Sequence, residues 1–169
     1  MYTQKSNFPK IENATEGLPF ECFNIIHNRF LPANEQNAIT ICEYINSMKS
    51  EINPADYYRK SVILLLSRFS IFFKNAKSFE EITREDLLLF LDSFRKSEMS
   101  DPLHRLIGTY NLFRIHLMRF FKWLYYPDIK HKQRPRPHLI ENIPKLKRKA
   151  VSFWIILSHV SSCNFSCPS

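Results

Sequence analysis

The fold of this chain is decided by residues 53–74, which read NPADYYRKSVILLLSRFSIFFK. Asn53 can cap a helix, Pro54 suits the first helical position, and Asp56 places negative charge in the first turn. From Tyr58 onward the apolar residues form a face broad enough to be covered by more than one neighbouring helix. This stretch therefore predicts the central helix of a helical domain.

Helical periodicity on either side of the central helix predicts three more helices, at residues 34–49, 83–96 and 103–125. Asn34 and Thr83 can cap the first two, and Pro127 ends the last. On the last helix the aromatic residues fall on one side and are expected in the core, whereas the opposite side is basic. The pattern predicts an all-α fold with a four-helix domain at residues 34–126.

The segments outside this domain carry no sustained helical period. Residues 1–33 contain three prolines and one glycine, so we expect a flexible, loosely ordered lead-in. Residues 127–150 combine four prolines with almost wholly positive charge, which predicts an extended basic linker. Residues 151–169 hold no charged side chain and are expected to form a divergent tail of undefined fold.

Composition and charge narrow the function. The 169 residues are 44% hydrophobic and 24% charged, as in a globular protein, and with only 2 glycines there is no phosphate-cradling glycine motif. Nucleotide-binding P-loop and Rossmann folds are therefore excluded. The net charge is +8, and residues 101–150 hold 12 Lys or Arg against 3 acidic residues. This asymmetry predicts a polyanionic partner, either nucleic acid or an acidic membrane surface.

The sequence shows no targeting or metal-binding signal. The first ten residues lack the apolar core of a signal peptide, and no apolar run is long enough to span a bilayer. The four cysteines are therefore expected as reduced thiols of a cytoplasmic protein. His159, Cys163 and Cys167 recur every four residues, but a structural zinc site needs four ligands. We expect no metal, no cofactor and no small-molecule substrate.

Four segments carry a resemblance to a known family. They are EITREDLLLFLD at 81–92, GTYN at 108–111, RFFKWLYYPD at 119–128 and ENIPKLKRK at 141–149. In this order they resemble the N-terminal core-binding domain of archaeal tyrosine recombinases, of the phage integrase type, over about residues 35–150. The resemblance implies a SAM-like helical domain that grips one side of a DNA duplex while a separate catalytic domain grips the other. It also implies that the linker passes along the DNA between the two domains.

The catalytic chemistry of that family is not matched. In the family a tyrosine attacks the scissile phosphate, arginine, lysine and histidine side chains stabilise its charge, and one arginine lies in an H-x-x-R motif. His116-Leu-Met-Arg119 fits the motif, but it lies inside the last predicted helix, and Tyr125 and Tyr126 follow within two turns. We therefore expect no catalytic residue and no enzyme activity, as in a recombinase truncated or frame-shifted near residue 150.

The expected function is binding of double-stranded DNA at a recombination site, with an intact recombinase protomer as a second partner. Phosphate contacts should dominate, and Asn111 and His116 could reach base edges in the major groove. Aside from His116, the residues expected to contact DNA are Arg105, Asn111, Arg114, Arg119, Lys122, Lys130, Lys132, Arg134, Arg136, Lys145, Lys147, Arg148 and Lys149.

One alternative stays open from the sequence. A basic helical module could bind acidic proteins or an anionic membrane surface without any preference for DNA. A gel shift with duplex DNA, set against vesicle pelleting, separates these two functions.

Overall fold

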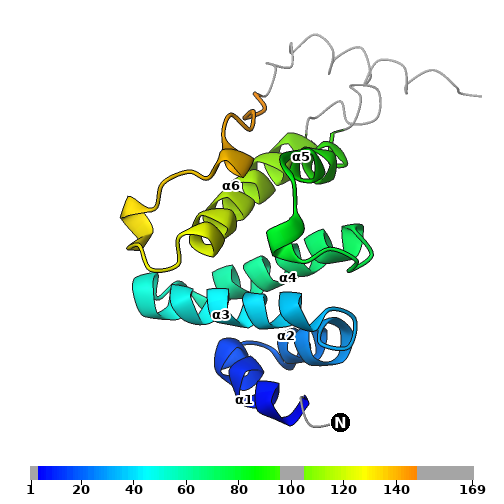
Figure 1. The fold of residues 1–169 in the computed structure, drawn as a ribbon, viewed down its shortest axis with the longest axis vertical. Coiled ribbons are helices and arrows are strands. Elements are labelled where there is room, and N and C mark those ends of the chain that lie inside the picture. The colour runs from blue at the N-terminus through cyan, green and yellow to red at the C-terminus, as the bar shows by residue number, and fades with distance from the viewer. Residues whose placement is uncertain (1–3, 96–104, 148–169) are drawn as a thin grey trace, which may run out of the picture.

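The computed structural model describes residues 4–95 and 105–147, and these residues are helical or irregular, with no strand (Figure 1). This confirms the predicted all-α class. The α-helices are α1 (Gln4–Thr15), α2 (Phe20–Asn24), α3 (Glu35–Ile52), α4 (Asp56–Phe72), α5 (Arg84–Asp92) and α6 (Arg105–Tyr125). A π-helical segment, η1 (Ile25–Phe30), continues α2, and short 3₁₀ turns lie at η2 (Phe79–Glu81), η3 (His131–Gln133) and η4 (His138–Ile140).

Two of the predicted helix starts are confirmed by their side-chain caps. The Asn34 side chain accepts the Asn37 N–H at 3.0 Å, which begins α3. The Thr83 hydroxyl accepts the Asp86 N–H at 3.2 Å, and the Asp86 carboxylate accepts the Thr83 N–H at 3.0 Å. This reciprocal pair satisfies two of the free amides at the start of α5.

The expected cap at Asn53 is wrong. α3 runs on to Ile52, and Asn53 ends it in the left-handed conformation, with φ of 39°. Asparagine tolerates this conformation better than most residues, so it serves as a C-terminal stop. α4 then begins at Asp56, after Ala55, whose side chain makes no capping bond.

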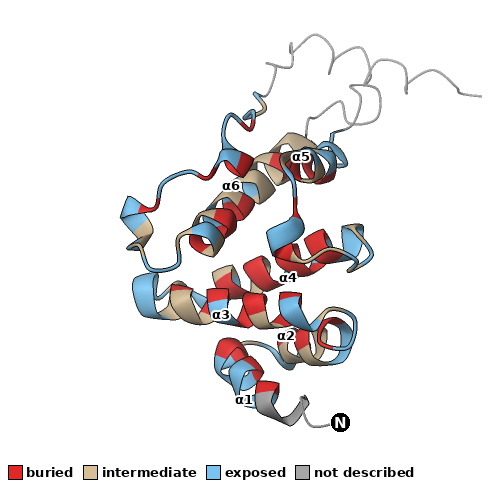
Figure 2. Cartoon of the chain, viewed as in Figure 1, coloured by how far each residue is buried: buried red, intermediate tan, exposed pale blue. Residues whose placement is uncertain are grey.

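α4 is the central helix, as its broad apolar face predicts. The ring of Phe69 is fully buried, and its centroid lies 4.8 Å from that of Phe90, 6.1 Å from Phe121 and 6.3 Å from Phe79. These neighbours belong to α5, α6 and η2, so a single α4 side chain touches three other elements. Burying a ring of this size stabilises a fold by about 2–3 kcal/mol. Figure 2 shows the buried residues along the inner sides of α3, α4 and α6.

Residues 4–30 are not the loosely ordered lead-in expected from the sequence. α1 packs on α3, and Ile11, Ala14, Cys22, Ile26 and Phe30 are all buried. The prediction failed because the buried stripe of α1 includes two polar residues, which hides its period. These are Asn7, whose amide donates to Glu35 at 2.7 Å, and Thr15, whose hydroxyl donates to the Ile11 carbonyl at 2.7 Å. Six α-helices, rather than four, therefore build the described part of the chain.

Residues 127–147, here called the strap, return antiparallel along α6. The strap leaves the C-terminal end of α6 at Pro127, and its Leu146 reaches Asn111 near the other end of the helix. Leu139, Ile140 and Ile143 are buried. The strap is therefore anchored to the core by apolar side chains, and Figure 1 shows its path back along α6.

Candidate nucleic-acid interface

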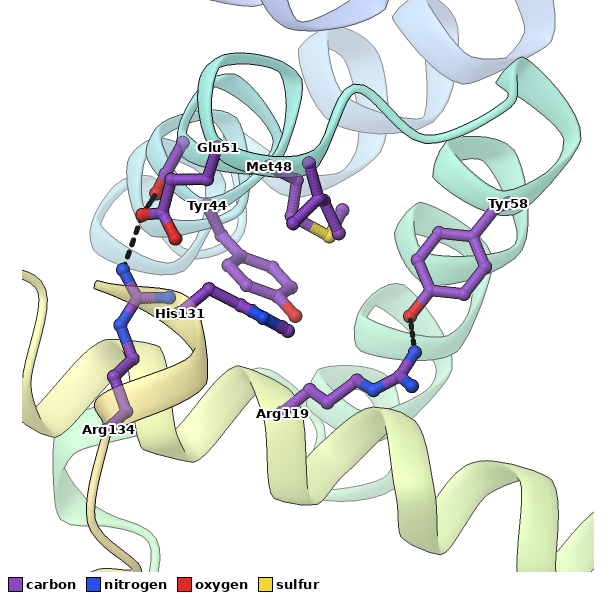
Figure 3. A pocket seen from close by; sticks show the side chains of 9 residues that line it. Tyr44, Met48, Glu51, Tyr58, Arg119, His131 and Arg134 are labelled. Atoms are coloured by element: carbon purple, nitrogen blue, oxygen red, sulfur yellow. Dashed lines mark hydrogen bonds and ion pairs between the residues drawn. The ribbon is translucent and has the colours of Figure 1, made fainter. Parts of the chain in front are cut away.

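A hollow of about 280 Å³ lies between the C-terminal half of α6 and the strap. We call it the basic hollow, and it is lined by Arg119, Lys122, His131, Lys132 and Arg134. The two α6 residues share a face because they are three positions apart on a helix. The 3₁₀ turn η3 brings the strap residues opposite them. Figure 3 shows Arg119 and Arg134 on either side of His131.

Three cations of the basic hollow have no acidic partner within the described ranges. The side-chain ammonium groups of Lys122 and Lys132 make no ion pair or hydrogen bond there, and Lys132 is exposed. The Arg119 guanidinium is exposed, donates to the Tyr58 hydroxyl at 2.6 Å and lies 5.9 Å from the centre of that ring. Tyr58 orients the guanidinium without neutralising it. The hollow therefore presents uncompensated positive charge to an incoming anion.

Arg134 lines the same hollow but is buried and fully engaged, with 5% of its surface exposed. Its Nε donates to the Tyr126 carbonyl at 3.0 Å, and an Nη donates to the Pro127 carbonyl at 3.2 Å and to the Glu51 carboxylate. Arg134 is therefore not free to contact a phosphate, and the prediction that it would do so is wrong. Its bonds instead tie the start of the strap to the end of α3 (Figure 3).

The acid in this pair stays ionised near neutral pH. Partial burial opposes ionisation of Glu51, but hydrogen bonds from Arg134 and Ser47 outweigh it and hold the pKa of Glu51 below its ordinary value. Beneath the pair lies a cavity of about 10 Å³, which is about the size needed for one water molecule. Tyr44 lines this cavity, and burial raises the pKa of its hydroxyl. The Tyr44 hydroxyl therefore stays protonated.

Asn111 and Arg114, both half-buried, also hold the strap. The Asn111 amide donates to the Leu146 carbonyl at 2.9 Å and accepts the Leu146 N–H at 3.1 Å. Arg114 Nε donates to the Ile143 carbonyl at 2.9 Å, and the hydroxyl of Tyr110 donates to a strap carbonyl one residue further on, at 3.2 Å. Both the NH2 group and the oxygen of the Asn111 side chain are hydrogen-bonded to Leu146. The prediction that Asn111 contacts a base edge is therefore wrong.

His116 is likewise no candidate for base contact. It is 6% exposed, and its ring lies 5.0 Å from the ring of Tyr58. Burial lowers the pKa of His116, and the nearby charge of Arg119 lowers it further. No described residue hydrogen-bonds its Nδ1. The H-x-x-R sequence thus combines a buried, neutral histidine with an exposed arginine.

The other expected cations lie along the strap or beyond the described residues. Exposed cations without an ion pair in the described chain are Lys130, Arg136, Lys145 and Lys147. The side chain of Arg105, together with Arg148 and Lys149, lies outside the residues that the structure describes.

The sequence-based prediction missed two residues that position the strap, although the position of each one in its helix indicates a partner. Glu51 lies in the last turn of α3, where the helix dipole disfavours an acid, and it pairs with Arg134. Arg84 lies in the first turn of α5, where the dipole disfavours a base, and it donates to the Glu141 carbonyl of the strap. A charge placed against its helix dipole indicates a partner elsewhere in the fold.

Comparison of the chain with protein families, with curated proteins and with solved structures found no match. Of the helices that the structure describes, none has the length and apolar character needed to cross a membrane. The described residues also contain no group of three or more side chains placed to hold a metal ion. Cys22 and Cys42 are buried free thiols, and burial raises the pKa of Cys42 to about 12.

Proposed function

We propose that α6 and the strap bind double-stranded DNA through its phosphates, as the core-binding part of a tyrosine-type site-specific recombinase would at a recombination site. The observation that carries this proposal is the basic hollow, where Arg119, Lys122 and Lys132 meet without an acidic partner in the described chain. Counterion release by such cations is the main source of DNA affinity.

The dimensions of this surface suit a duplex. Hydrogen bonds place the strap beside α6 from residue 110 to residue 126, a length of about 24 Å at 1.5 Å per helical residue. That length corresponds to about seven base pairs. Lys130, Arg136, Lys145 and Lys147 are exposed along the strap, and we expect several of them to contact phosphates of one duplex.

The proposed contacts read charge and shape rather than base sequence. Asn111, the residue best suited to pair with a base edge, is committed to the strap. Phosphate contacts fix the position of a protein on DNA without selecting a sequence. We therefore expect the contacts at the basic hollow to contribute equally to the affinity for duplexes of any sequence.

The test is the salt dependence of binding, measured by fluorescence anisotropy with a labelled duplex. If about six cations engage phosphates, the slope of log K against log salt should be about −5. A slope near zero would overturn the proposal. A pelleting assay with anionic vesicles is the comparison. If the protein pellets with vesicles but does not bind the duplex, the membrane-surface alternative is favoured.

A further inference from the structure

A second hollow, remote from the strap, is built from aromatic rings of α1 and α2. We call it the aromatic hollow; it measures about 570 Å³, and its lining includes Phe8, Phe20, Phe23, Leu18, Glu12 and Glu16. The Phe23 ring stacks on Phe20 with centroids 5.7 Å apart and meets the edge of Phe8 at 5.4 Å. These contacts hold the three rings in one cluster.

The rings are unusually open to solvent for their size. Phe20 is 72% exposed and Phe8 is 41% exposed. Single exposed apolar residues are ordinary on a protein surface, but contiguous exposed aromatic rings in a concave site mark a binding surface. Phe23 is pinned from its other side by the stacked ring of His27, with centroids 5.2 Å apart. The cluster is therefore preorganised rather than collapsed.

The charged residues that line the aromatic hollow are acidic. Glu12 is exposed and has no ion pair among the described residues. Glu16 is bonded by Lys49 at 2.8 Å, yet 74% of its side chain remains exposed. Of the α1 cations, Lys10 is the one whose side chain the structure describes; it pairs with Glu43 of α3 at 3.3 Å and does not line the hollow. Among the described residues, the lining therefore offers one unpaired carboxylate, Glu12, one carboxylate shared with Lys49, and no cation.

We propose that the aromatic hollow binds a protein segment that carries Lys or Arg side chains among apolar residues. The aliphatic part of such a side chain packs on phenyl rings, its cation is attracted to the ring faces, and the rim carboxylates can accept its hydrogen bonds. A nucleic acid or an anionic membrane is repelled by the same carboxylates. The occupant is therefore a cationic protein segment.

The probe is a short fluorescent peptide of leucine and lysine, titrated with the full chain. Phe20→Ser should weaken its binding by about tenfold, and Glu12→Gln by about threefold. Tyr57→Ser is the matched control, because Tyr57 is 81% exposed on a different helix and lines no part of this hollow. Its affinity for the peptide should equal that of the wild type.

Three results would overturn the proposal. They are failure of the wild-type chain to bind the peptide, equal binding by the Phe20→Ser variant, and equally tight binding of a peptide of leucine and glutamate that Phe20→Ser weakens in the same way. Phe20 and Glu12 are both exposed, so loss of binding in these variants can be separated from unfolding by a thermal melt. Duplex affinity should not change in either variant, so this proposal and the proposed DNA binding can fail independently.

Discussion

Arg134 lines the basic hollow, but its buried guanidinium holds the strap in place rather than facing a ligand. Its guanidinium joins two backbone carbonyls of the α6–strap corner to the Glu51 carboxylate. We expect Arg134→Gln to lower the free energy of unfolding by about 2–3 kcal/mol, because a partly buried carboxylate and two carbonyls lose their donor. Urea denaturation measures this.

Arg95→Gln is the matched control for that measurement. Arg95 pairs with Asp92 at 3.2 Å, but both side chains are about half exposed. A surface pair of this kind contributes well under about 1 kcal/mol. Equal destabilisation by the two substitutions would contradict the role assigned to Arg134.

We expect the free energy of unfolding to depend on pH because His116 is buried. Burial, followed by the charge of Arg119, lowers the pKa of His116 in the folded chain, so the unfolded chain binds the proton more readily. Stability should therefore fall as pH drops below about 6.5, the ordinary histidine value. Denaturation at a series of pH values measures this fall. In His116→Leu the fall between about pH 6.5 and 5 should be reduced, and an unchanged profile would contradict the assignment.

At the scale of elements, the helices that could be predicted are those whose signals are local. The caps at Asn34 and Thr83 each lie within a single turn of sequence. The apolar stripes of α3 to α6 repeat every three or four residues, so the sequence indicates them directly. α1 escaped prediction because Asn7 and Thr15 occupy its buried stripe. Asn7 is satisfied by Glu35 of α3, a distant partner that the sequence does not show, whereas Thr15 bonds the Ile11 carbonyl within α1.

The anchoring of the strap could not be predicted for a related reason. The bonds that hold it join side chains of α6 to backbone groups 29 to 35 residues away. Backbone partners have no sequence signature, so Asn111 and Arg114 looked like free polar residues on a basic helix face. Charge composition alone therefore predicted the basic surface but overestimated how many of its residues are free to bind.

The two hydrogen bonds from Asn111 should hold the end of the strap against α6. Asn111→Ala removes both bonds to Leu146, and we expect a loss of about 1–2 kcal/mol confined to the end of the strap. The Leu146 amide should then exchange with solvent much faster, while the amides of the middle of α6 keep their protection. Leu112→Ala, at the neighbouring position where the side chain is 50% exposed, is the control. Unchanged exchange at Leu146 would show that Asn111 does not hold the strap.

At the scale of the whole molecule, the two hollows are built from different elements of the fold. α1 and α2 carry the aromatic hollow, and α6 with the strap carries the basic hollow, with α3 and α4 between them (Figure 1). The unpaired cations of the basic hollow are therefore separated from the aromatic hollow. A molecule of this kind can hold a polyanion at one hollow and a cationic protein segment at the other.

The most direct measurement of the proposed DNA binding compares salt slopes of charge-removing variants. Arg119→Gln, Lys122→Gln and Lys132→Gln combined should make the slope of log K against log salt shallower by about 3, since each phosphate contact contributes about 0.9. Lys74→Gln removes an exposed charge at the far end of α4, where it has no ion pair in the described chain, and should leave the slope unchanged. Equal slopes for the triple variant and the wild type would contradict DNA binding at the basic hollow.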